Sequence, residues 1–109
     1  MKTEIPLACD MDVFTREQRE DHIRVTTQLV KAMQNIREIQ NGYEFVFPSE
    51  SLTITRIAEF IANERLCCPF LGFGLIVKPN DPFISLSLNG PVGTQEFLRV
   101  EFEEAFQCK

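Results

Sequence analysis

The stretch that decides the fold is Ile54–Val77, ITRIAEFIANERLCCPFLGFGLIV, because its periodicity changes from helical to strand-like within a few residues. The first half has the apolar spacing of a helix, and the last seven residues alternate as a strand does. Pro69 disfavours helical geometry at the residue before it. The helix should therefore end at two adjacent cysteines, Cys67 and Cys68.

Toward the N-terminus, the pattern predicts one long helix and one short strand. Thr15 and Gln18 form a capping box, and apolar residues at four-and-three spacing continue the helix to about Gln40. Asn41-Gly42 would end it, because these residues tolerate positive φ. The aromatic, β-branched run 43–47 predicts a strand.

Toward the C-terminus, the pattern predicts a hairpin and a last helix. Strands over 71–77 and 84–88 flank the turn-rich segment 78–82, and a glycine-proline turn leads into a helix over 94–107. With the helix over about 52–66, the order is α-β-α-β-β-α. We expect a single α+β domain over 1–109, with three helices on one face of a small, mostly antiparallel sheet of three strands. The lead-in, residues 1–14, could add a fourth strand.

The composition narrows the class of protein. Hydrophobic residues make up 44% of the 109 residues and charged residues 25%, which is typical of a globular domain. The net charge of −5, without a Lys/Arg cluster, gives no expectation of nucleic-acid binding. No apolar run reaches the length of a membrane span or a secretory signal. We therefore expect no membrane partner, a cytoplasmic location and reduced thiols.

The long first helix also suggests a partner. A helix over 15–40 would be about 38 Å long, more than a domain of this size can cover. We therefore predict a homodimer contact along it.

The adjacent cysteines favour metal binding over a bridge. Their Cα atoms lie about 3.8 Å apart, closer than a disulfide prefers, so a Cys67–Cys68 bond would be strained. Glu64 lies one turn earlier on nearly the same side, and Arg65 is near enough to offset thiolate charge. A metal ion displaces the thiol protons itself and needs no activated nucleophile.

Cys9 is the natural third ligand. It lies beside Asp10 in an irregular segment that can drape over a helix end. Three thiols suit a soft ion such as Hg(II), Cu(I) or Zn(II), with Asp10 and Glu64 as auxiliary oxygen donors. Cys108, next to the C-terminus, is interpreted as an incidental surface thiol.

Two other functions fit the same residues. In a thiol-dependent oxidoreductase or lyase, Cys68 would attack and Cys67 or Cys9 would resolve. In a non-catalytic interaction module, the cysteines would be small packing residues. His22, the only histidine, lies at the edge of the first helix's apolar stripe, where a packed or solvated role is expected.

Three blocks of the sequence support the metal hypothesis. They are Ala8-Cys9-Asp10, Glu64-Arg65-x-Cys67-Cys68-Pro69-Phe70, and Leu88-x-Gly90-Pro91-x-Gly93 followed by Phe97-Leu98. Together they resemble a family of small uncharacterised bacterial proteins, in which the Glu-Arg-x-Cys-Cys-Pro-Phe block is the most specific part. The resemblance implies metal handling, because such relatives occur beside heavy-metal resistance functions, including mercury-responsive regulation.

Overall fold

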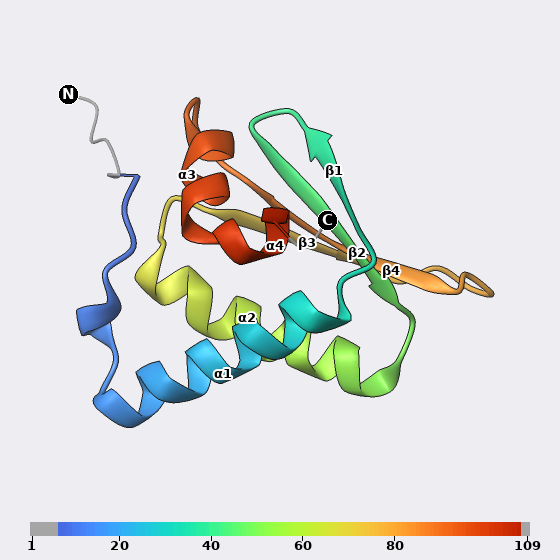
Figure 1. Cartoon of the computed structure of the whole chain (residues 1–109), viewed down its shortest axis with the longest axis horizontal. Helices are drawn as coiled ribbons and strands as arrows, with labels where there is room; N and C mark the ends of the chain where they lie inside the picture. Colours follow the sequence, from blue (N-terminus) through green and yellow to red (C-terminus); the bar gives the residue numbers. More distant parts are fainter. Residues whose placement is uncertain (1–6, 108–109) are drawn as a thin grey trace.

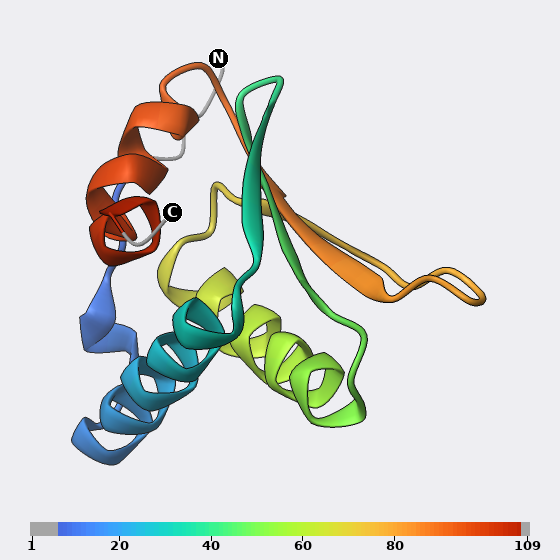
Figure 2. The ribbon, with the colours of Figure 1, turned by 45° about the vertical axis from the view of Figure 1, so that its right-hand side comes forward.

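The computed structural model describes residues 7–107 and contains a four-stranded antiparallel sheet in the order β1-β2-β4-β3 (Figure 1). The helices lie together on one side of this sheet (Figure 2). The predicted α+β class is confirmed, and the number and order of elements differ. In chain order these elements are η1 (Met11–Val13), α1 (Arg16–Ala32), β1 (Asn35–Ile39), β2 (Gly42–Pro48), α2 (Ser51–Cys67), β3 (Gly72–Ile76), β4 (Phe83–Asn89), α3 (Thr94–Glu101) and α4 (Glu103–Gln107).

The fourth strand, β1, lies where the sequence predicted the end of the first helix. The capping box at Thr15 is present, but α1 stops at Ala32, and the chain joins the sheet when Gln34 donates its backbone N–H to Val46. Asn41, at φ 54°, turns β1 back into β2 instead of ending a helix. The prediction of a helix to Gln40 is wrong because the isoleucines that continued the helical stripe pack equally well on a strand.

The described part of the lead-in, residues 7–14, contains no strand. Residues 11–13 form the short 3-10 helix η1, and residues 1–6 and Cys108 lie outside the described part of the chain. Because α1 has only 17 residues, it lacks the extra length on which the homodimer prediction was based. The homodimer contact therefore remains a prediction.

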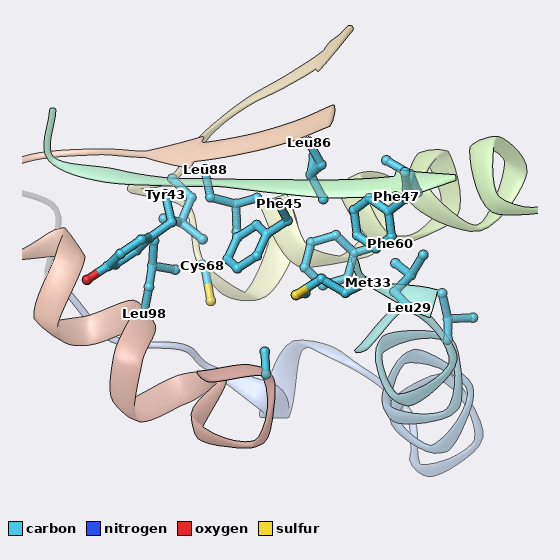
Figure 3. Close-up of a cluster of buried hydrophobic side chains, with 14 of the residues drawn as sticks. Leu29, Met33, Tyr43, Phe45, Phe47, Phe60, Cys68, Leu86, Leu88 and Leu98 are labelled. Atoms are coloured by element: carbon cyan, nitrogen blue, oxygen red, sulfur yellow. The ribbon is translucent and has the colours of Figure 1, made fainter. Parts of the chain in front are cut away.

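The core lies between the sheet and the helices. Alternate residues of β2 and β4 point toward the helices, and these are the buried ones. Figure 3 shows them near Leu29 of α1, Met33 directly after α1, Phe60 of α2 and Leu98 of α3. The buried strand residues are Tyr43, Phe45, Phe47, Ile84, Leu86 and Leu88.

The hairpin and the last helix follow the prediction with two adjustments. The β3–β4 loop has six residues, 77–82, and the last helix breaks at Phe102 into α3 and α4. Gly93 precedes α3 at φ 101°, a conformation that favours glycine. Within residues 7–107, no helix combines the length and apolar character needed to cross a membrane.

Candidate functional site

The buried face of α2 positions the first ligands. Its buried residues follow four-and-three spacing, and the last two are Glu64 and Cys67. The apolar spacing predicts that Ile54, Ile57, Ala58 and Ile61 are buried, and this is correct for Ile57, whereas Ala58 is exposed and the other two isoleucines are only partly buried. The observed face is rotated, and it carries Glu64 into the protein. Its members are Thr53, Ile57, Phe60, Glu64 and Cys67.

The end of α2 is joined to the lead-in by a hydrogen bond and a disulfide. Asp10 donates its backbone N–H to the carbonyl of Cys67 at 2.8 Å, which brings the preceding residue, Cys9, onto the helix end. Cys9 and Cys68 form a disulfide with their Cα atoms 4.6 Å apart. The expectation of reduced thiols is therefore wrong for this pair. Cys67, the free cysteine of the described chain, makes no bond to Cys68, as the strain argument predicted.

The predicted convergence of Cys9, Cys67 and Cys68 is confirmed, and Glu64 completes the group. The carboxylate of Glu64 accepts from Cys67 Sγ at 3.5 Å through Oε1, and its Oε2 lies 3.5 Å from Cys68 Sγ. The sulfurs of Cys67 and Cys68 are 3.8 Å apart. One ligand atom from each of the four residues lies within 4.8 Å of all the others.

This group is almost entirely removed from solvent. The side chains of Cys67 and Cys68 are fully buried and Glu64 is 3% exposed. Cys9 is half-buried and forms the rim of the site. Figure 3 places Cys68 among the apolar residues between the sheet and α3, so the site is continuous with the core.

His22 of α1 is the residue that the sequence interpretation undervalued. Its Nε2 lies 2.7 Å from Oε1 of Glu64, and both side chains are 4% exposed. The ring lies between Phe14 and Phe60, with centroids 5.6 and 5.5 Å away. Among residues 7–107, nothing hydrogen-bonds its Nδ1. Glu64 is therefore the hydrogen-bond partner that holds this imidazole in the core.

A signal for His22 was present in the sequence. His22, Val25 and Leu29 follow the spacing of one helix face, and all three are buried. A polar residue on a buried helix face requires a buried partner, because an unpaired polar group in the core is costly. Glu64 supplies that partner from a position 42 residues away, which periodicity cannot identify.

The surroundings keep Cys67 protonated. Burial, followed by the negative charge of Glu64 and the hydrogen bond to it, raises the pKa of Cys67 to about 12. Glu101 at the end of α3 adds a smaller contribution of the same sign. Cys67 is therefore a thiol at neutral pH and a weak nucleophile, because the thiolate is the reactive form.

The structure does not bring the other two predicted residues into the group. The carboxylate of Asp10 caps η1 by accepting from the backbone N–H of Asp12 at 3.0 Å, and it is exposed. Arg65 is also exposed. What Asp10 contributes is its backbone N–H, which fastens Cys9 to the helix end.

Comparison with known proteins assigns no family to this chain. Neither the models of protein families, nor the curated proteins, nor the solved structures contain a match to this chain.

Proposed function

We propose that the chain, with the Cys9–Cys68 disulfide reduced, binds a soft metal ion through three thiolates and Glu64. The ions that suit this donor set are Zn(II), Cu(I) and Hg(II). The observation that carries the proposal is the convergence of four ligand atoms within 4.8 Å at the end of α2. A cytoplasmic location would favour the reduced state that binding requires.

The spacing of the ligand atoms supports tetrahedral coordination. Zinc–sulfur bonds of about 2.3 Å place two sulfur ligands about 3.8 Å apart, and a sulfur and an oxygen ligand about 3.6 Å apart. The Cys67–Cys68 sulfurs are 3.8 Å apart, and the Cys68 sulfur lies 3.5 Å from Oε2 of Glu64, while the Cys67 sulfur lies 3.5 Å from the other oxygen, Oε1. Opening the disulfide would let Cys9 withdraw to a similar distance from Cys68.

His22 would support the ion without touching it. Its hydrogen bond to Oε1 leaves Oε2 of Glu64 directed at Cys68, where it could coordinate. Such bonds from an outer residue orient a ligand and tune its basicity. The high pKa of Cys67 is compatible with this role, because an ion displaces the thiol proton on binding.

A thiol–disulfide oxidoreductase is the second candidate, and the Cys9–Cys68 disulfide is the observation that favours it. Half-buried Cys9 would meet the substrate thiol, and Cys68 would be its internal partner. Cys67 fits this function poorly, because it is buried and protonated. An interaction module with inert cysteines is disfavoured, since Cys9 lies at the pair and not far from it.

Metal titration of the reduced protein tests the proposal. We would use Cys108→Ser protein, so that the thiols counted belong to the site, and add Zn(II), Cu(I) or Hg(II) against a competing chelator. We expect one ion per chain, and at least a hundredfold weaker binding after Cys67→Ser or Cys68→Ser, because lost outer-shell contacts alone cost 10–100-fold, roughly. Unchanged affinity in both variants would refute metal binding at this site.

The same variants separate the second candidate. An oxidoreductase would form a mixed disulfide at Cys9 or Cys68 with a substrate thiol and would retain it after Cys67→Ser. A metal site would lose affinity in that variant. Mass spectrometry of trapped adducts, recorded beside the titration, distinguishes these results.

A further inference from the structure

We infer that the Cys9–Cys68 disulfide is the release switch of this metal site, so that disulfide and bound ion exclude each other. The inference rests on the proposed function. Its structural basis is that the same two sulfurs belong to both the disulfide and the four-ligand group.

The exclusion follows from the number of ligands. A sulfur in a disulfide is no longer a thiolate, and the thiolate is the form that binds metal. Oxidation therefore removes Cys9 and Cys68 together and leaves only Cys67 and Glu64. Two ligands are too few for Zn(II), which is four-coordinate in protein sites, so the zinc should leave.

The chemistry balances with a small disulfide as the oxidant. A thiolate of the loaded site attacks one sulfur of glutathione disulfide, forming a mixed disulfide and expelling one glutathione thiolate. The second site thiolate attacks the protein sulfur of the mixed disulfide, which forms Cys9–Cys68 and expels the second glutathione thiolate. Two electrons pass from the site to glutathione disulfide, and the ion is released.

The position of Cys9 directs the first attack. It is the half-buried member of the group, whereas the sulfurs of Cys67 and Cys68 are enclosed by the core. The oxidant should therefore meet Cys9 first. Cys68 is then the resolving thiol, with the Asp10–Cys67 backbone hydrogen bond keeping the two cysteines adjacent.

Cys67 has a different part in the switch. It lies 3.8 Å from Cys68 and yet remains a thiol in the disulfide state. It is thus the sulfur ligand that stays in place through the cycle. Reduction by a dithiol would restore the other two sulfurs around it.

The test follows zinc and disulfide together. Reduced, zinc-loaded Cys108→Ser protein is treated with glutathione disulfide; a chromogenic chelator reports free zinc, and mass spectrometry after alkylation reports Cys9–Cys68. We expect one zinc released per disulfide formed, and more than about a hundredfold weaker zinc binding by the oxidised protein. Zinc that stays bound with equal affinity after the disulfide has formed would overturn the inference.

A matched variant assigns the release to Cys9. Cys9→Ser retains Cys67, Cys68 and Glu64 and should bind zinc more weakly than the parent, but the oxidant should release no more zinc from it than an untreated sample of the same variant loses. Equal release from this variant would contradict a switch made by Cys9–Cys68. Failure of the reduced parent protein to bind any of the three ions would instead refute the proposed function, so the two failures are distinct.

Discussion

The two halves of the buried face of α2 have the same burial and spacing but opposite chemistry. The first half carries Ile57 and Phe60, which pack into an apolar core. The second half carries Glu64 and Cys67, which contact each other, a disulfide sulfur and His22. One half is explained by the free energy of burial alone, whereas the other places polar groups where burial opposes them.

This difference distinguishes the residues that only stabilise the fold from those that form the candidate site. An apolar residue in place of Glu64 would satisfy the helix pattern without requiring a buried partner. The chain instead places a carboxylate, an imidazole and three sulfurs near one helix end, where the carboxylate is paired with the imidazole. Such an arrangement is expected where a site has a task beyond packing.

Reducing the disulfide should produce the largest loss of stability. Cys9 and Cys68 are separated by 59 positions, and closing a loop of that length stabilises a fold by about 4 kcal/mol. Denaturant unfolding of Cys108→Ser protein with and without a reductant measures the loss. Zinc should restore part of it, because an ion bound to the reduced state cross-links the same segments. Coincident unfolding curves would show that the cross-link contributes nothing.

Truncating the apolar half should cost nearly as much stability but leave the site's chemistry intact. Ile57 is fully buried, so Ile57→Ala should lower the free energy of unfolding by about 3 kcal/mol. The zinc affinity of the folded variant should not change. Exposed Ala58→Ser is the matched control, with little effect on either quantity. A large loss of zinc affinity in Ile57→Ala would show that the two halves are not separable.

Converting the second half into an apolar one should lower the free energy of unfolding by a smaller amount, and the effects of its substitutions should not be additive. Glu64→Leu leaves the buried Nε2 of His22 without its partner, which should cost about 1–3 kcal/mol. His22→Leu together with Glu64→Leu should recover most of that loss, because no polar group is then left unpaired. The double variant should still bind zinc more weakly than the parent protein.

Unfolding of both single variants and the double variant forms the thermodynamic cycle that checks this coupling. If the double variant loses the sum of the two single effects, the His22–Glu64 pair is not the reason that either residue is buried.

Much of the contrast between the two halves of α2 could be predicted from the sequence, but the contact between His22 and Glu64 could not. The helix end at Cys67, the antiparallel hairpin and the convergence of Cys9 on the cysteine pair are local or chemical inferences, and the structure confirms them. The pairing of His22 with Glu64 depends on how α1 crosses α2. Periodicity gives each helix a buried face but does not say which residues of two faces meet.

Two predictions, a helix over residues 35–39 and reduced thiols at Cys9 and Cys68, failed because each outcome depends on contacts between separate segments of the chain. Residues 35–39 satisfy a helical stripe, yet β2 offers them backbone partners, and tertiary pairing prevails over local preference. The disulfide could not be anticipated either. The sequence showed that Cys67–Cys68 would be strained but gave no distance from Cys9 to either cysteine.

The smallest expected effect is a loss of stability at alkaline pH that belongs to Cys67. Its pKa is about 12 in the folded chain against an ordinary value of 9.0, because of burial and of the carboxylates of Glu64 and Glu101. Above pH 9 the unfolded chain has released this proton and the folded chain has not. Stability is therefore full below pH 9 and falls as pH rises toward 12, by about 1 kcal/mol between pH 9 and 10.

Disulfide-bonded Cys108→Ser protein isolates this titration, because Cys67 is then its free thiol. Subtracting the ultraviolet absorbance of the Cys67→Ser counterpart removes the tyrosine contribution, and we expect no thiolate signal from the folded protein up to pH 10. Over the same pH range, the protein with Cys67 should lose stability relative to its Cys67→Ser counterpart, since serine does not titrate there. A thiolate step near pH 9 would mean that Cys67 is ionised like an exposed thiol, and the contrast between the two halves of α2 would then lose its electrostatic basis.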